Sequence, residues 1–473
     1  MPRLVGRNQE KKLLNDALNS NKSELIAIYG RRRVGKTFLV NQVYKNRIIF
    51  SFSGLINTTL KTQLENFHLL LSQKKNKLQK PKNWIVAFYN LQEYITKIKS
   101  TKKKVIFIDE FPWLDSRKSN FLTAFDNFWN NYASKREDLV VIICGSAASY
   151  MIKNIIRSKG GLHNRITNKI NLKPFNLYET ELLLKKNKVN LSRYDILQLY
   201  MCFGGIPHYL ERINPGESVV SIINKLCFEK DAFLQNEFDN IFYSLFDNAN
   251  NHITIITVLS KVKKGLTRKE IITKSKLKSG GAITNTLNEL IASGFLEKQI
   301  PFSGRKSSLY RLTDEYTLFY LKFIKNQSQN STNTWQTMYS KNSYKIWSGF
   351  SFENICLKHI NQIKEGLKIT GIYTKTGSWV EKNEEKGTQI DLLIDRADNT
   401  INLCEIKFYN SEFTLTKSYV DILRNKISVF KEKTKTKKNI FTTLITTYGI
   451  KINKYSTQYI QNELLIDDLF IDV

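Results

Sequence analysis

The segment from Gly30 to Thr37, GRRRVGKT, constrains the fold of this chain more than any other. It matches the phosphate-binding loop, in which glycine, four residues and Gly-Lys-Ser/Thr join a strand to a helix. The flanking sequence agrees, because the apolar run 24–29 suits a buried strand and residues 38–43 continue as a helix. Backbone N–H groups at a helix N-terminus attract phosphate. The segment therefore predicts a nucleotide-binding α/β fold.

The residue types in this loop predict which atoms bind the nucleotide. Backbone N–H groups would surround the phosphates, Lys36 would reach the outer phosphates, and the Thr37 hydroxyl would bind Mg²⁺. The expected cofactors are ATP and Mg²⁺. The loop residues expected to bind nucleotide are Gly30, Arg31, Arg32, Arg33, Val34, Gly35, Lys36 and Thr37.

Two later strands end in polar residues that fit the same site. The apolar run 104–109 ends in Asp109 and is followed by Glu110. In a phosphate-loop ATPase the first acid holds the Mg²⁺ shell, and the second can orient or deprotonate the attacking water. Another apolar run, 139–145, ends before Ser146, which could sense the terminal phosphate from a strand between the two motif strands. Alternating strands and helices predict a parallel sheet with its ligands at the strand C-termini.

Length and charge bound the architecture and the partners. The chain has 473 residues, which predicts roughly two to four domains. Its formal net charge of +31 implies attraction to polyanions such as nucleic acid or acidic lipid. Residues 251–350 hold 16 Lys/Arg against 5 Asp/Glu, whereas residues 201–250 hold 3 against 7. This contrast favours a localised polyanion-binding surface. The alternative is that part of the excess of basic over acidic residues reflects a proteome rich in Lys and Asn.

Cysteine spacing and hydropathy exclude several protein classes. The five cysteines lie far apart without paired spacing, which argues against a disulfide framework and a zinc site. The N-terminus does not resemble a signal peptide, and no apolar run approaches membrane-spanning length. We therefore expect a reduced, cytoplasmic protein that does not associate with membranes.

Taken together, these motifs resemble the archaeal and bacterial ATPase family of the AAA+/STAND group, whose members carry a C-terminal nuclease-like domain of uncharacterised function. The resemblance covers essentially the whole chain, and its motifs are specific in combination. The segments that carry it are 4–10, 30–37, 107–113, 141–146, 164–167, 172–175 and 204–210.

The resemblance implies roles for residues outside the loop. Gly6 and Arg7 would lie near the adenine. Arg165 matches a position that could serve as an arginine finger in a neighbouring subunit, which implies a homo-oligomer formed through the ATPase module; a surface arginine is the alternative. Pro207 belongs to a lid motif near the nucleotide. Relatives often have a basic residue after this proline, but this chain has His208, a poorer phosphate sensor when neutral.

The middle of the chain predicts a winged helix-turn-helix. Helical patterns at 253–262, from Thr267 onward and at 280–293 precede two strands, 295–300 and 308–312, which flank a basic turn. The third helix would face a DNA major groove and the wing tip a backbone. A winged helix used for protein contacts, or as a spacer, is the alternative. The residues expected to contact DNA are Lys278, Thr284, Asn285, Asn288, Arg305 and Lys306.

The C-terminal region fits the PD-(D/E)XK nuclease pattern. Asp391 lies on one expected strand, with Glu405 and Lys407 on the next. Side chains two residues apart on a strand share a face, and a hairpin brings both carboxylates together to bind one or two Mg²⁺. Lys407 would position or activate water, and Glu353 would add an acid from the preceding helix. A charged hairpin without catalysis is the alternative. An amphipathic helix at 419–430 and a solvated loop at 431–438 would follow.

These patterns together predict three domains and two functions. The expected domains are a P-loop ATPase with a helical lid at 1–245, a winged helix-turn-helix at 250–325 and a PD-(D/E)XK nuclease-like α/β domain at 335–473. One function is an ATP-hydrolysing protein that acts on DNA, with a Mg²⁺-dependent endonuclease. The alternative is a STAND-like switch whose nuclease-like domain is an effector or an inert interaction module. The expected catalytic residues are Asp109, Glu110, Arg165, Asp391, Glu405 and Lys407.

Overall fold

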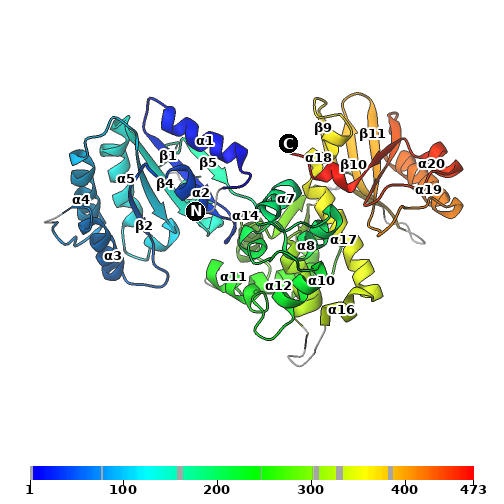
Figure 1. Ribbon diagram of the computed structural model, residues 1–473, viewed down its shortest axis with the longest axis horizontal. Coiled ribbons are helices and arrows are strands. Elements are labelled where there is room, and N and C mark those ends of the chain that lie inside the picture. The colour runs from blue at the N-terminus through cyan, green and yellow to red at the C-terminus, as the bar shows by residue number, and fades with distance from the viewer. Residues whose placement is uncertain are drawn as a thin grey trace. The chain divides into compact units, whose positions relative to one another are not determined.

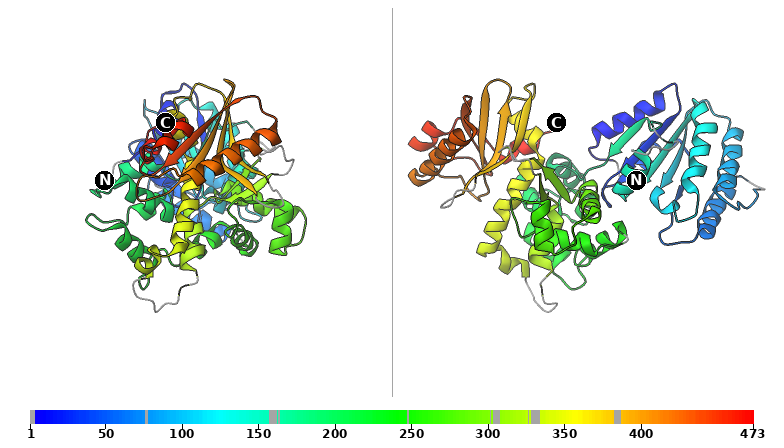
Figure 2. Two further views of the ribbon diagram at one scale, coloured as in Figure 1. Left: turned by 90° about the vertical axis from the view of Figure 1, so that its right-hand side faces the viewer. Right: turned by 180° about the vertical axis from the view of Figure 1, so that it is seen from behind.

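The computed structural model divides into two compact units, shown in Figures 1 and 2. The first unit holds residues 1–174 together with 288–294, and the second holds residues 175–287 and 295–473. The expected three-domain boundaries remain predictions. The structure describes residues 4–75, 78–156, 162, 164–246, 248–300, 302, 308–325, 327, 334–381 and 387–473.

The first unit is built on a five-stranded parallel sheet in the order β2-β3-β4-β1-β5. The expected α/β fold with a parallel sheet is thus confirmed. β4 lies between β1 and β3, so it separates the strand of the phosphate-binding loop from the strand of the two acids. The strands are β1 (Glu24–Tyr29), β2 (Ile48–Ser53), β3 (Lys104–Asp109), β4 (Leu139–Gly145) and β5 (Asn168–Asn171).

Helices cover both faces of this sheet, with α3, α4 and α5 together on one side and α1 on the other (Figures 1 and 2). Local caps fix two of their starts, because the side chains of Thr59 and Asn83 accept hydrogen bonds from the first turns of α3 and α4. The helices are α1 (Asn8–Asn19), α2 (Lys36–Val43), α3 (Leu60–Ser72), α4 (Trp84–Lys97), α5 (Phe121–Asn131) and α6 (Ala148–Tyr150).

Aromatic packing joins α3–α5 to the sheet. Trp84 packs edge-on against Phe121, with ring centroids 4.9 Å apart, and against Phe67 at 5.8 Å. All three side chains are almost completely buried. Burying a side chain of this size contributes about 1.5–3 kcal/mol, so this packing holds α3, α4 and α5 together on one face of the sheet.

The second unit begins with a helical region and ends with a second sheet. Five of its helices, α7 to α11, precede residues 250–312, which hold the elements expected of a winged helix and are called the winged-helix segment below, and six helices, α15 to α20, follow that segment. The helices are α7 (Leu177–Lys186), α8 (Arg193–Phe203), α9 (Pro207–Leu210), α10 (Val219–Cys227), α11 (Glu237–Leu245), α15 (Glu315–Phe319), α16 (Thr334–Tyr339), α17 (Asn342–Lys358), α18 (Ile360–Gly366), α19 (Lys417–Thr434) and α20 (Lys454–Tyr459).

The elements expected of a winged helix are present in order. A capping box opens the second helix, in which the Thr267 hydroxyl accepts from the Glu270 N–H at 3.2 Å and the Glu270 carboxylate accepts from the Thr267 N–H at 2.8 Å. Gly294 follows the third helix with a φ of +79°. A short strand not expected from the sequence, β6, pairs with β8. The elements are α12 (Asn250–Leu259), α13 (Arg268–Ser275), α14 (Gly281–Ala292), β6 (Leu266–Thr267), β7 (Leu296–Gln299) and β8 (Leu309–Leu312).

The C-terminal sheet has the order β13-β12-β11-β10-β9, antiparallel from β9 to β11 and parallel from β11 to β13. The expected hairpin is β10–β11, and Leu392 pairs with Cys404 in it. α19 and α20 lie on one side of this sheet and α17 and α18 on the other (Figure 1). The strands are β9 (Thr374–Glu381), β10 (Thr388–Arg396), β11 (Thr400–Lys407), β12 (Asn439–Thr446) and β13 (Asn462–Leu464).

One buried histidine joins the helical region to the C-terminal part of the second unit. The Leu177 N–H donates to His359 Nε2 at 3.0 Å, and His359 Nδ1 lies 2.8 Å from the Ile355 carbonyl oxygen. Because Nε2 accepts, the proton resides on Nδ1 in the neutral ring. Burial lowers the pKa of His359 to about 4. Protonation of the ring would place a second proton on Nε2, which would then face the Leu177 N–H and could no longer accept its hydrogen bond.

We expect His359 to make stability depend on acidic pH. The pKa of His359 in the folded protein lies below its ordinary value. The folded state therefore has its full stability with respect to this group above about pH 6.5, and it loses stability as the pH falls toward 4. This loss amounts to at most about 3 kcal/mol. Urea unfolding between pH 8 and pH 4 checks it: His359→Gln should be less stable at pH 8 and should lose less stability on acidification than the wild type. Parallel pH profiles would contradict this assignment.

Candidate functional site

The phosphate-binding loop connects β1 to α2, as expected from the sequence. Glycine is required at its first position, because a Cβ atom on Gly30 would lie 2.3 Å from the Leu172 carbonyl oxygen. Gly35 precedes α2 with a φ of +92°, a conformation that favours glycine. The loop thus takes its shape from backbone conformations that its glycines allow.

Lys36 is buried within this loop. Its Nζ donates to the carbonyl oxygens of Gly30 and Arg31, both at 3.0 Å. Burial lowers its pKa, and the negative charges of Glu110 and Asp109 oppose that shift. A phosphate oxygen is a stronger acceptor for an ammonium group than a neutral carbonyl is. The loop therefore holds Lys36 through bonds that a phosphate could replace.

The structure brings together Thr37 and Asp109, the two residues expected to hold Mg²⁺. The Thr37 hydroxyl donates to Asp109 Oδ2 at 2.6 Å, and the Glu110 N–H donates to Asp109 Oδ1 at 2.9 Å. Hydroxyl and carboxylate oxygens are ligands that Mg²⁺ prefers. The residues present therefore fit a hard divalent cation beside the nucleotide phosphates.

Ser146 lies beside Glu110, and it holds that carboxylate through two hydrogen bonds. Its Oγ donates to Glu110 Oε1 at 2.9 Å and its backbone N–H donates to Oε2 at 3.3 Å. The contact exists because β4 lies next to β3. The position fits the expected place of Ser146, and it adds a function that the sequence did not suggest, namely to orient Glu110.

The remaining residues expected around the nucleotide lie in different places. Arg7 is buried, and its guanidinium donates to the Val34 carbonyl oxygen at 3.2 Å, so the segment containing Gly6 reaches the loop. Arg165 is exposed before β5. Pro207 opens α9 in the second unit. The roles of these residues remain predictions. Within the loop, Arg31 and Val34 are buried, whereas Arg32 and Arg33 are partly buried.

A second group of charged residues lies on the β10–β11 hairpin. Asp391 Oδ2 accepts from the Ile406 N–H at 3.1 Å, which fixes Asp391 against β11. Glu405 is fully buried. Its Oε1 accepts from Lys426 at 2.6 Å, and Oε2 accepts from the Tyr419 hydroxyl at 2.9 Å with Lys407 Nζ 3.6 Å away. The hairpin thus brings Asp391, Glu405 and Lys407 to one place, as expected.

Glu353 joins this group electrostatically from α17. Burial and the charge of Asp391 raise the pKa of Glu353 to about 7. Burial and the charge of Glu405 raise the pKa of Asp391. We call these three acids, with Lys407, the acidic site. Over the described ranges, no three Asp, Glu, His or Cys side chains are grouped closely enough to hold a metal ion by themselves.

Sequence reasoning missed the two partners of Glu405 on α19. Tyr419 and Lys426 are seven residues apart, so they lie on one face of the helix, together with the buried Leu423 and Phe430. A lysine within the apolar face of an amphipathic helix is the signal that could have identified Lys426. Its partly buried position favours an acidic partner.

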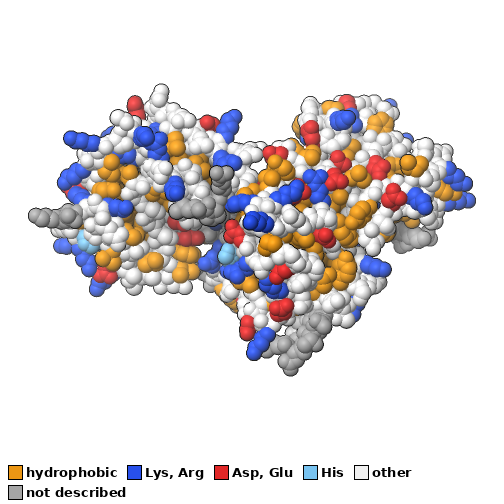
Figure 3. Space-filling view, in the orientation of Figure 1, with side chains coloured by type: hydrophobic (Ala, Val, Ile, Leu, Met, Phe, Trp, Pro, Cys, Tyr) orange, Lys and Arg blue, Asp and Glu red, His pale blue; other side chains and the backbone are white. Residues whose placement is uncertain are grey.

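The residues expected to contact DNA differ in exposure. Lys278, Asn285 and Asn288 are exposed. Thr284 is partly buried, and its hydroxyl accepts from Arg268 Nε at 3.1 Å, so it is already engaged. Arg305 and Lys306 lie outside the described residues. Lys and Arg side chains are spread over the face shown in Figure 3, with Asp and Glu among them.

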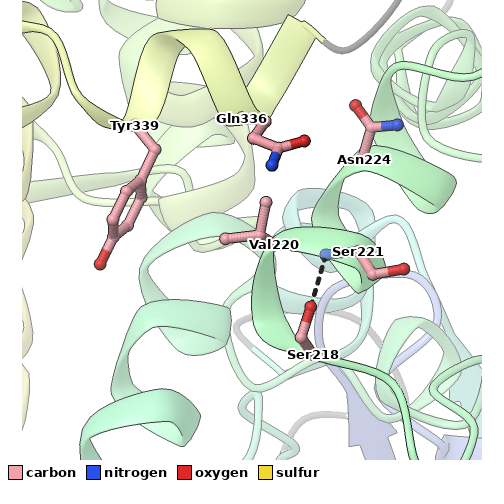
Figure 4. Close-up of a pocket in the computed structure, with 6 residues that line it drawn as sticks. All are labelled: Ser218, Val220, Ser221, Asn224, Gln336 and Tyr339. Atoms are coloured by element: carbon pink, nitrogen blue, oxygen red, sulfur yellow. Dashed lines mark hydrogen bonds between the residues drawn. The ribbon is translucent and has the colours of Figure 1, made fainter.

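A separate cavity of about 330 Å³ lies between α10 and α16 (Figure 4). The Ser218 hydroxyl caps α10 by accepting from the Ser221 N–H at 3.2 Å. None of the motif residues reaches this cavity, so its position does not support a role in either site. The lining residues are Ser218, Val220, Ser221, Asn224, Gln336 and Tyr339.

Comparison with known proteins identifies the ATPase part. Residues 4–213 match the model of an ATPase domain found predominantly in Archaea. The chain carries an ATPase domain of this family. The ATPase domain contains the phosphate-binding loop and both strand-end motifs, and ATP binding and hydrolysis are its chemistry. Residues 320–419 match a second model, which describes archaeal and bacterial proteins of unknown function.

Two curated relatives come from Methanocaldococcus jannaschii. An uncharacterised protein is 27% identical over 426 residues, which is 89% of this chain and 91% of the relative. An uncharacterised ATP-binding protein is 47% identical over 45 residues, which is 10% of this chain and 76% of the relative. Similarity to the first of these relatives extends well beyond the ATPase domain.

Solved structures also align with the chain. The Walker-type ATPase of Pyrococcus abyssi is 16% identical, covering 68% of this chain and 98% of its own, with a TM-score of 0.49. The ORC2 protein of Aeropyrum pernix is 14% identical, covering 72% of this chain and 96% of its own, with a TM-score of 0.41. A search of the described helices finds none long and apolar enough to cross a membrane.

We expect Lys36→Met to weaken ATP binding. Loss of the ammonium removes charge-assisted hydrogen bonds of roughly 1.5–3 kcal/mol, which corresponds to about 10- to 100-fold in affinity. Titration with a fluorescent ATP analogue measures this change. The matched control is Lys45→Met, an exposed lysine just beyond α2, which should bind like the wild type. Equal affinity of Lys36→Met and Lys45→Met would contradict the role of Lys36.

Proposed function

We propose that this protein acts on DNA under the control of ATP, and that its C-terminal part is a Mg²⁺-dependent nuclease. The observation that carries the proposal is the meeting of Glu353, Asp391, Glu405 and Lys407, which come from one helix and two strands. Acids that repel one another in a buried place are uncommon without a function.

In the ATPase domain, Lys36 would bind the outer phosphates, and Thr37 and Asp109 would hold Mg²⁺. Glu110, oriented by Ser146, would position the attacking water. The exposed Arg165 would complete the site of a neighbouring copy in an oligomer. Gly6 and Arg7 would lie near the adenine, and Pro207 would contribute from the lid.

In the acidic site, Asp391 and Glu405 would provide oxygen ligands for Mg²⁺. This ion keeps several waters and commonly uses only one or two carboxylates together with substrate phosphates, so three grouped protein ligands are not required. Bound Mg²⁺ would polarise the phosphodiester. Lys407 would position the water, and Glu353 would contribute a further acid.

The winged-helix segment would supply the grip on DNA. Lys278, Asn285 and Asn288 are exposed, as direct contact requires. Phosphate contacts from lysine and arginine give affinity, and amide side chains can read base edges in the major groove. The basic excess of residues 251–350 favours nucleic acid over a protein partner.

One observation favours the second function, a STAND-like switch with an inert nuclease-like module. Both carboxylate oxygens of Glu405 are engaged, one by Lys426 and the other by Tyr419. A metal ion would have to displace at least one of these partners. If they are permanent, the acidic site is a structural charge cluster and the C-terminal part mediates assembly.

The proposal predicts Mg²⁺-dependent cleavage of DNA that requires Asp391 and Lys407. Asp391→Asn and Lys407→Met should each lower the cleavage rate at least about 100-fold, because each removes a group that acts on the reacting phosphate. Gel assays on linear, circular and single-stranded DNA, with and without ATP, measure the rate.

The matched control is Asp395→Asn on the same strand, whose carboxylate pairs with Lys438 at 2.6 Å, and it should cleave like the wild type. Cleavage that persists at the wild-type rate in Asp391→Asn would reject the nuclease. No cleavage by the wild type on any substrate would favour the switch.

A further inference from the structure

The acidic site receives positive charge from two parts of the second unit. Lys407 and Lys426 come from the C-terminal sheet and α19, as described above. Arg311 and Lys263 come from the winged-helix segment, and both act electrostatically on Glu353. The winged-helix segment thus contributes to the charge balance of a site that lies on other elements.

Arg311 is the more unusual of these two cations. It lies on β8 with only 5% of its surface exposed, whereas Lys263 is exposed. Its guanidinium lies 5.4 Å from the ring centroid of Phe350, one turn before Glu353 on α17. Its Nε is buried without a hydrogen-bond partner in the described part of the chain.

The charge of Arg311 needs an explanation beyond packing. Burying a guanidinium is unfavourable unless acids compensate it, and a leucine or methionine could cover Phe350 without that cost. Burial lowers the pKa of Arg311, and Glu353 is the strongest of the acids that oppose this shift, followed by Glu297 and Asp391. Glu297 lies directly across the sheet on β7. The two other acids belong to the acidic site.

We infer that Arg311 of the winged-helix segment is a buried counter-ion of Glu353, and that a divalent cation binds the acidic site in competition with its guanidinium. The competition rests on the proposed function, because it assumes that the acidic site binds metal. The counter-ion role does not depend on that assumption.

A double-mutant cycle on the full chain, without metal, tests the counter-ion. Arg311→Met should lower the melting temperature, since it removes the buried positive charge that compensates Glu353, and adding Glu353→Gln should restore most of the loss. The matched control replaces the cross-strand acid, and Arg311→Met/Glu297→Gln should restore much less. Additive effects of Arg311→Met and Glu353→Gln would overturn the inference. If Arg311→Met does not fold, recovery of folding in Arg311→Met/Glu353→Gln supports it and failure of both contradicts it.

Titration with Mn²⁺, followed by the electron paramagnetic resonance of the free ion, tests the competition. Arg311→Met should bind Mn²⁺ about tenfold or more tightly than the wild type, because a buried positive charge near the carboxylates is gone. Lys298→Met, which removes an exposed lysine of β7, should bind like the wild type.

Equal affinity of Arg311→Met and wild type would reject the competition while leaving the nuclease intact. No Mn²⁺ binding by either protein would reject both the competition and the metal-dependent nuclease. The double-mutant cycle would still decide the counter-ion role on its own.

Discussion

Buried charge is the constraint on which both sites depend. In the ATPase domain, Lys36 is held by loop carbonyls, Asp109 by Thr37, and Glu110 by Ser146. Each of these groups would be costly if it were buried alone. The sheet order provides a partner, because β4 lies next to β3 and places Ser146 beside Glu110. In this network each of these groups already has a hydrogen-bond partner. Binding of a nucleotide and its metal would therefore replace these hydrogen bonds with contacts to the phosphates and the metal.

The second unit meets the same constraint with partners from distant segments. Glu405 depends on Tyr419 and Lys426 of α19, and Glu353 depends in part on cations of the winged-helix segment. The winged-helix segment and the C-terminal part, which the sequence assigns to separate domains, therefore interact electrostatically.

Local patterns predicted most of the fold. The strand at 24–29 and the start of a helix at Thr267 were expected within the residues where the structure has them. The hairpin of Asp391 and Glu405 was expected too, because its strands are close in sequence. One exception is the run 431–438, expected as a loop, since α19 continues to Thr434 before Lys435 adopts a left-handed conformation. Lysine and glutamate favour helix even where they are solvated.

The parts of the sites that escaped prediction come from pairing across long sequence distances. Ser146 was expected at the nucleotide, but its contact with Glu110 depends on which strands are neighbours. Lys426 and Arg311 were not predicted to belong to a site, since their acidic partners lie on other elements. A single sequence gives the period of a helix or strand, and it does not give the partner that each face meets.

The central claim is that nucleotide state controls how this protein holds DNA. The most direct measurement is the affinity for a fluorescent DNA duplex at fixed salt, with a non-hydrolysable ATP analogue or with ADP, in the wild type and in Lys36→Met. The wild-type affinities should differ by about fivefold or more between the two nucleotides, and the difference should disappear in Lys36→Met. Equal affinities in the wild type, or no binding to the duplex, would contradict it.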